Sequence, residues 1–296
     1  MSVYAVAEAS PSRVLGVLRF VMAYAGQSPS RSIVEAMMAP PGLVSDRTEE
    51  ITAEVDSEKG SGRALLQPAI KEAIRLGLLD ENEKELRLGQ CLNRKLIAHP
   101  HLWPLAVFEL ILDPKRGDHD LCRALAWFLA QDIPTVPGGW SAMQSKNDIL
   151  SALEMNVVSF GQMQHWAVYL GFGWRCGRAA RGVFVFDPTA HLKLRLSQEL
   201  GKKSRHFSAT DFLKHLGEWC PVVDGGRYRT ELEEKQVLQK LAQSDVSQAL
   251  SQALRRLSDE GWIEMSHASD AKAVILSSPD EPERVSKINW KGDPQS

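Results

Sequence analysis

The sequence predicts a mainly helical fold with small β-hairpins, which belongs to the α+β class. Apolar residues recur at helical spacing along most of the chain. Short apolar runs follow three glycines, and proline or polar clusters separate the segments. A chain of 296 residues with 44% hydrophobic residues is long and apolar enough for two or three units with buried cores.

The first region, residues 1–90, predicts three helices and then two short strands. Ser10 and Pro11 suit a helix start, because serine caps helices and proline fits their first turn. A second helix fits residues 28–39, and a third fits residues 63–77. The acidic stretch 44–62 between them predicts a mobile loop or a weak helix. LLDENEKELRLG (78–89) then predicts two strands around a polar turn.

The region 228–280 has the same outline. RTELEEKQVLQKLAQ predicts an amphipathic helix, and a second helix leads to Gly261. WIEM and AVIL then predict two strands joined by the turn SHASD. The residues after Pro279 are polar, and we expect a loosely held tail over 281–296.

The largest region, residues 91–200, predicts extra helices and then a third copy of the outline. Helices fit 91–114, 118–132, 145–156 and 161–172, with a break at IPTVPGGW. The last of these helices leads through Gly171 to an arginine-bearing turn between two apolar runs. We expect residues 201–227 to form a basic linker.

Alignment on the glycines supports a repeated unit. Leu66 and Leu250 both lie eleven residues before their glycine, at Gly77 and Gly261. The middle copy matches less closely, since Gln164 lies where the other two carry isoleucine or leucine. The order helix, helix, helix, hairpin resembles a winged helix. We therefore expect tandem winged-helix units joined by extra helices.

Positive charge is concentrated in the middle unit. The whole chain has a formal net charge of −2, yet residues 161–215 hold nine lysines and arginines against three acids. Residues 28–90 hold eight against twelve, and residues 218–296 hold ten against fourteen. A DNA contact is therefore expected in the middle and not at the ends.

A basic hairpin can lie along a nucleic-acid backbone, where each phosphate that it neutralises releases counterions. The alternative is a solvated, charged loop. We expect phosphate contact, without sequence specificity, from ten candidate residues. They are Gln164, His165, Arg175, Arg178, Arg181, Lys193, Arg195, Lys202, Lys203 and Arg205.

The other polar helix faces predict a different role. Gln67, Lys71 and Arg75 share one face of the third helix, and Ser247, Gln248, Ser251, Gln252, Arg255 and Arg256 make a polar surface on the last helix. Such side chains can contact bases. In acidic surroundings we favour ordinary solvated faces that dock partner proteins.

No enzyme motif is present in the sequence, and we expect no catalytic residues, no cofactor and no metal site. His99 and His101 are two residues apart and do not share a helix face. Asp118-His119-Asp120 predicts a helix start, where acids suit the helix dipole. The eight tryptophans are interpreted as core or domain-contact residues and not as a base-stacking platform.

The four cysteines, Cys91, Cys122, Cys176 and Cys220, have no metal-site spacing, and we expect reduced and mostly buried thiols. Neither a signal peptide nor a membrane-spanning run is found in the sequence. These features favour a cytoplasmic protein without a membrane partner.

The run HWAVYLGFGWR…GVFVFDPTAHLKL (165–194) and the N-terminal unit resemble DpdG-type accessory proteins of bacterial 7-deazapurine DNA-modification and defence islands. The resemblance implies a non-enzymatic DNA-binding or adaptor subunit beside helicase or nuclease partners. Two alternatives stay open: a winged-helix transcription regulator and a purely protein-docking structural adaptor.

Overall fold

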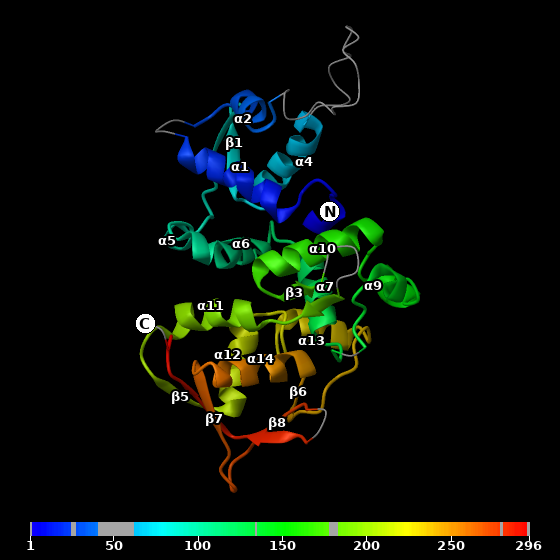
Figure 1. Cartoon of the computed structure of the whole chain (residues 1–296), viewed down its shortest axis with the longest axis vertical. Helices are drawn as coiled ribbons and strands as arrows, with labels where there is room; N and C mark the ends of the chain where they lie inside the picture. Colours follow the sequence, from blue (N-terminus) through cyan, green and yellow to red (C-terminus); the bar gives the residue numbers. More distant parts are fainter. Residues whose placement is uncertain are drawn as a thin grey trace. The chain divides into compact units, whose positions relative to one another are not determined.

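A computed structural model describes residues 2–24, 28–40, 62–133, 135–177, 183–278 and 281–294. The chain divides into two compact units, residues 1–118 and 119–296 (Figure 1). The two boundaries at the ends of the expected linker, near residues 200 and 228, fall inside the second unit. Within the described residues, no helix is long and apolar enough to cross a bilayer.

Unit 1 begins with the predicted order of three helices and a hairpin. Its elements are α1 (Pro11–Ala23), α2 (Arg31–Met38), α4 (Gly62–Arg75), β1 (Leu79–Asn82) and β2 (Glu85–Leu88). Pro11 occupies the first turn of α1, and the Ser30 hydroxyl accepts a hydrogen bond from the backbone N–H of Ile33 at the start of α2. The expected loop over 44–62 lies outside the described residues, apart from Gly62, the first residue of α4.

The β1–β2 hairpin closes through two residues in the left-handed region, Glu83 and Lys84. Its strands pair from Leu79 opposite Leu88 to Asn82 opposite Glu85, and Ser30 bridges to Glu85. This order and pairing agree with the hairpin that the sequence predicts. Classification of the unit as a winged helix stays a prediction.

Unit 1 continues through α5 (Arg94–Ile97), the 3-10 helix η2 (Pro100–Leu102) and α6 (Trp103–Ile111). At the start of the chain, residues Val3–Ala5 form the 3-10 helix η1. The core of the unit contains Val14, Leu18, Ile70 and Leu86, all fully buried.

The first half of unit 2 contains five helices and one hairpin in its described residues. They are α7 (His119–Leu129), α8 (Trp140–Met143), α9 (Asn147–Ala152), α10 (Val157–Leu170), β3 (Gly173–Cys176), β4 (Val183–Phe186) and α11 (Thr189–Leu200). Helices α7, α9 and α10 agree with the segments that the apolar spacing predicts between residues 118 and 172, whereas α8 begins at the end of the expected break and was not predicted. Helix α11, which contains the whole of HLKL (191–194), is an addition to the prediction.

The second half of unit 2 is built around two small sheets. Its elements are β5 (Arg205–Ser208), α12 (Ala209–Trp219), α13 (Arg227–Glu234), β6 (Asp245–Val246), α14 (Gln248–Asp259), β7 (Ile263–Ser266), β8 (Val274–Leu276), β9 (Glu283–Val285) and β10 (Lys287–Trp290). One sheet has the order β5-β10-β7 and is antiparallel. The other has the order β6-β8-β9, with a parallel pair between β6 and β8.

The expected linker over 201–227 is wrong. Residues 205–219 form β5 and α12, and Phe212 and Leu216 of α12 are fully buried. The basic run GKKSRHF that suggested a linker covers only the turn into β5. The helical spacing of the next segment determines its packing instead.

The expected hairpin between WIEM and AVIL is also wrong. Strand β7 pairs with β10, whereas β8 pairs with β6 and β9. The alternation of apolar and polar residues along β10 explains why β7 pairs with it. Ile288 and Trp290 of β10 lie directly opposite Met265 and Ile263 of β7 and form an apolar face with them.

The expected loose tail over 281–296 contains β9 and β10. Val285, Ile288 and Trp290 are buried, and β10 is the central strand of its sheet. The segment is polar on average, but its apolar residues face the core.

The helix expected over 229–243 ends at Glu234. Gln236 takes a left-handed backbone conformation, with φ of 58°. The backbone N–H groups of Val237 and Leu238 both donate to the carbonyl of Leu232, which closes the helix end.

Candidate nucleic-acid interface

The β3–β4 hairpin extends from the end of α10. Asn156 and Ser159 form a reciprocal capping box that starts α10, and Gly171 ends it with φ of 83°. A Cβ on Gly171 would lie 2.8 Å from the backbone nitrogen of His191, so this position requires glycine for its angle and for its space. The contact holds the first turn of α11 against the base of the hairpin.

Arg175 lies on β3 with an exposed and oriented side chain. Its Nη2 donates to the Gln164 side-chain oxygen at 2.8 Å, and its guanidinium carbon lies 5.8 Å from the centre of the Phe184 ring. No acidic side chain pairs with Arg175 in the part of the chain that the structure describes. The guanidinium therefore keeps its charge and has further N–H donors for a phosphate.

Gln164 and His165 lie next to Arg175, as the sequence grouping implies. Gln164 is only 4% exposed, and its Nε2 donates to the Gly138 carbonyl at 3.4 Å. This bond fixes the amide, whose oxygen accepts the hydrogen bond that orients Arg175. His165 is exposed on α10. Partial burial, followed by the charge of Arg175, lowers the pKa of His165. We therefore expect a neutral hydrogen-bonding group and not a cation near pH 7.

The candidate residues Arg178 and Arg181 belong to residues 178–182, which lie outside the described residues. Their role as phosphate contacts stays a prediction.

Lys193 and Arg195 lie on α11 and are engaged within unit 2. Lys193 forms an ion pair with Glu260, and Arg195 pairs with Glu199 at 3.0 Å. Both side chains are partly buried. Their charges are balanced by these acids, so they contribute less positive field than the sequence count implies.

Lys202, Lys203 and Arg205 follow the end of α11 and are all exposed. None of them pairs with an acid among the described residues. Among the candidate residues that the structure describes, the unpaired positive charge is therefore divided into two groups. We call Arg175 and the segment 202–205 the two basic ends of α11.

Helix α11 lies between the two basic ends along the chain. Twelve helical residues at about 1.5 Å each span about 18 Å. Figure 1 shows β3 near one end of α11, and β5 lies lower in the view, below the other end.

The polar face of α14 is not the solvated surface that the sequence predicts. Ser247 and Ser251 are buried, and the Ser251 hydroxyl donates to the Val246 carbonyl and accepts from the backbone N–H of Ser277. Arg255 pairs with Glu283 and also donates to the Ser277 carbonyl. Through these groups α14 binds to the end of β8 and to β9, two strands that lie later in the chain.

Trp174 is a candidate contact that the sequence interpretation missed. It is 39% exposed, so the expectation that all eight tryptophans are core or domain contacts is wrong at this position. Its indole N–H donates to Asp187 at 3.1 Å, and Asp187 also pairs with Arg256. Strand alternation offers the missing signal, since Trp174 and Arg175 must face opposite sides of β3.

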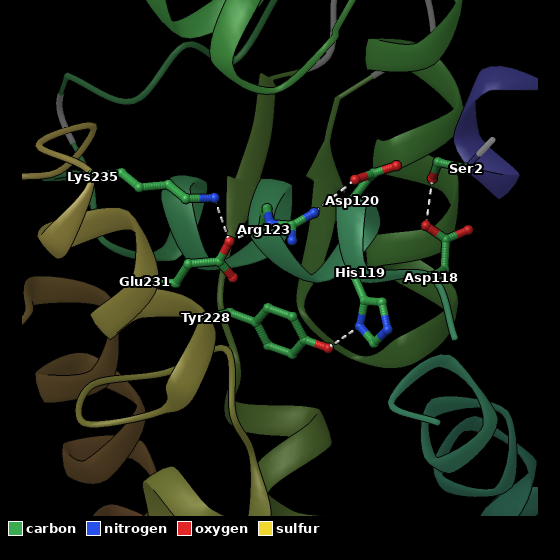
Figure 2. A network of polar contacts seen from close by, with 8 residues as sticks. All are labelled: Ser2, Asp118, His119, Asp120, Arg123, Tyr228, Glu231 and Lys235. Atoms are coloured by element: carbon green, nitrogen blue, oxygen red, sulfur yellow. Dashed lines mark hydrogen bonds and ion pairs between the residues drawn. The ribbon is translucent and has the colours of Figure 1, made fainter. Parts of the chain in front are cut away.

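The side chains of Asp118, His119 and Asp120 form hydrogen bonds and ion pairs that stabilise the fold. In unit 1 the Asp118 side chain is 1% exposed and accepts hydrogen bonds from the Ser2 hydroxyl and from the backbone N–H of Val3, each at 2.6 Å (Figure 2). Arg75 adds an ion pair at 2.8 Å. These bonds fix the beginning of the chain to the last residue of its unit.

In unit 2 a polar network joins α7 to α13 (Figure 2). The Tyr228 hydroxyl lies 2.6 Å from His119 Nδ1, and burial raises the pKa of Tyr228. Arg123 pairs with Asp120 at 2.8 Å and with Glu231 at 2.9 Å. The polar side chains of α7 and α13 thus form hydrogen bonds and ion pairs with one another, which is typical of a structural network.

No group of three or more His, Cys, Asp or Glu side chains suited to a metal ion occurs among the described residues. None of the four cysteines, all of which lie in the described part of the chain, forms a disulfide; Cys122 and Cys220 are buried, whereas Cys91 and Cys176 are exposed. The expectation of mostly buried cysteines therefore holds for only two of them.

Comparison with known proteins gives one family. The model of the DpdG-like family matches residues 1–271. No curated protein and no solved structure matches the chain.

Proposed function

The chain belongs to the DpdG-like family, whose members are accessory proteins of a DNA-modification system, and from this premise we propose a non-enzymatic subunit that binds DNA and docks other proteins. The setting that we propose is a bacterial DNA-modification or anti-phage defence assembly in the cytoplasm.

One observation carries the DNA-binding part of the proposal. Unpaired cations lie at both ends of α11, whereas the cations on the helix itself are paired with acids. An arginine that is oriented by a buried amide and left without a carboxylate is suited to bind phosphate.

The length of α11 is comparable to a short stretch of nucleic acid. Successive nucleotides of one strand of B-form DNA rise about 3.4 Å along the helix axis, so about 18 Å along that axis corresponds to about five nucleotides. We propose that the backbone lies along α11, with Arg175 at one end of the contact and Lys202, Lys203 and Arg205 at the other. Such contacts position the protein and carry no sequence information.

The acidic hairpin of unit 1 supports a protein-docking role. Glu83 is exposed at the end of the β1–β2 hairpin, and Glu81 beside it is exposed and pairs with Arg31 at 3.5 Å. Acidic side chains repel DNA and favour a basic partner surface. We propose that this hairpin contacts another subunit, such as a helicase or nuclease component.

Binding of random-sequence duplex DNA tests the proposal. The full chain is titrated at low salt against a fluorescent duplex, beside a variant with alanine at the two basic ends of α11, namely at Arg175, Lys202, Lys203 and Arg205. A control variant removes four exposed lysines elsewhere, namely Lys71, Lys95, Lys115 and Lys240. Thermal unfolding confirms that all three proteins are folded.

We expect the wild type and the control to bind and the α11 variant to lose at least tenfold in affinity. Equal affinity of all three proteins would refute the proposed interface. No binding by the wild type would favour a purely protein-docking adaptor. A strong preference for one palindromic sequence would favour the transcription regulator instead.

A further inference from the structure

One face of the β5-β10-β7 sheet is polar along its length. Directly opposed residues form two rows on this face, because side chains alternate along each strand. The rows are Ser208, Lys287 and Ser266, and then His206, Asn289 and Glu264. The other face carries Ile263, Ile288 and Trp290, which are buried in the core.

A cavity of about 880 Å³ opens over the polar face. Strand residues line it together with Thr210 and Asp211 of the first turn of α12 and with Ala271 and Lys272 of the loop after β7. We call it the Lys287 cavity, after the lysine on its central strand.

The lining of the Lys287 cavity carries more positive than negative charge. Lys272 and Lys287 both line it, and neither pairs with an acid among the described residues. Asp211 is the one acid among the lining residues. Its carboxylate accepts from the Ser208 hydroxyl at 2.7 Å, and its backbone N–H donates to the same hydroxyl at 3.1 Å. Asp211 therefore serves the cap of α12.

A histidine in the cavity has a fixed orientation. His206 Nδ1 lies 2.7 Å from the Asn289 side-chain oxygen, which can only accept, so Nδ1 carries the hydrogen. In the neutral ring the other nitrogen, Nε2, therefore carries no hydrogen and can only accept a hydrogen bond, whereas in the protonated ring it is a donor. The cavity thus combines two lysines with an oriented imidazole.

We propose that the Lys287 cavity binds a phosphate group, held by Lys272 and Lys287. The proposal rests on the DNA-binding function above and extends it, because Lys202, Lys203 and Arg205 lead directly into β5, which supplies His206. A strand that follows the exposed cations at the end of α11 reaches the cavity next. Lysine ammonium groups bind phosphate as point charges and tolerate variable geometry.

The experiment uses the full chain and three probes: inorganic phosphate, thymidine 5′-monophosphate and a fluorescent single-stranded oligonucleotide. Phosphate and the nucleotide are followed by calorimetric titration, and the oligonucleotide by anisotropy over a range of salt. The test variant is Lys272→Ala with Lys287→Ala. The control is Lys115→Ala with Lys240→Ala, which removes two exposed lysines that do not line the cavity.

We expect the test variant to lose at least tenfold in affinity for the nucleotide, while the control keeps the wild-type value. With the oligonucleotide, the salt slope should fall by about 0.7, since the cavity holds one phosphate and each single-strand phosphate contact contributes about 0.7. Unchanged binding of every probe that the wild type binds, or no binding of any probe by the wild type, overturns the proposal.

The outcomes also separate this proposal from the DNA-binding function. Nucleotide binding that the test variant loses, in a protein that binds no DNA, supports the cavity and refutes the function. Loss of DNA binding in the α11 variant, with no effect of Lys272→Ala and Lys287→Ala on any probe, supports the function and refutes the cavity. If Lys272→Ala with Lys287→Ala lowers the affinity for the oligonucleotide, and the wild type binds no free nucleotide, the source of the phosphate is a nucleic-acid strand.

Discussion

The guanidinium of Arg175 donates a 2.8 Å hydrogen bond to the side-chain oxygen of Gln164, so a buried amide orients an exposed charge. Replacing Arg175 with alanine leaves that oxygen without its partner, which we expect to cost about 1–3 kcal/mol of unfolding free energy. Urea unfolding measures the cost. In a Gln164→Met background the same substitution should cost much less, and an equal cost in both backgrounds would show that the bond is irrelevant to stability.

The carboxylate of Asp118 holds Ser2, Val3 and Arg75 together in unit 1. Asp118→Ala removes a buried acid and leaves Arg75 with Glu72 alone, so we expect a loss of about 3–5 kcal/mol in urea unfolding. Ser2→Ala removes a single bond and should cost about 1 kcal/mol. A loss in Asp118→Ala no greater than that in Ser2→Ala contradicts the anchoring role.

His191 predicts a pH dependence of stability. Burial lowers the pKa of His191 to about 3, against about 6.5 in an unfolded chain. The unfolded state therefore binds the proton first, and stability falls as the pH drops from about 6.5 toward 3, at about 1.4 kcal/mol per pH unit from this group. Urea unfolding at several pH values should give a shallower decline in His191→Asn.

A control separates titration from packing at this site. The His191 ring stacks on Phe172 at 4.2 Å between ring centres. Phe172→Leu weakens the packing but keeps the histidine, so it should lower stability at every pH and retain the wild-type slope. The same slope in wild type and His191→Asn would contradict the prediction.

The C-terminal strands predict the effect of truncation. Removing residues 281–296 deletes β10, which pairs with both β5 and β7 and buries Trp290. We expect amide hydrogen exchange in α12 and α14 to become much faster, because α12 loses its packing against β10 and α14 loses the ion pair between Arg255 and Glu283 of β9. Removing only residues 293–296 leaves β10 intact and should leave exchange in both helices unchanged. Slow exchange in the longer truncation would mean that β10 is dispensable.

Local patterns predict much of this fold. Helix starts at Pro11 and His119 follow from proline and acidic residues, and the glycine after α10 follows from its place between helical and alternating patterns. The residue-level grouping of Gln164, His165 and Arg175 also emerges from one short stretch. Each of these features depends on neighbours within about one or two turns of chain.

Strand pairing in unit 2 could not be predicted in the same way. Strand β7 pairs with β10. The other partner of β10 is β5, which lies more than fifty residues earlier in the chain than either strand. Register between such strands depends on tertiary packing of Ile288 and Trp290, which no local period reveals. For the same reason the sequence count of charges overstated the interface, since Glu260 neutralises Lys193 from a distant helix.

The salt dependence of duplex binding, measured separately for the two basic ends of α11, is the most direct test of DNA contact along that helix. Each phosphate contact contributes about 0.9 to the slope of log affinity against log salt concentration. Arg175→Gln should lower the slope by about 0.9, and alanine at Lys202, Lys203 and Arg205 should lower it by up to about 2.7. Slopes equal to that of the wild type in both variants would contradict DNA binding along α11.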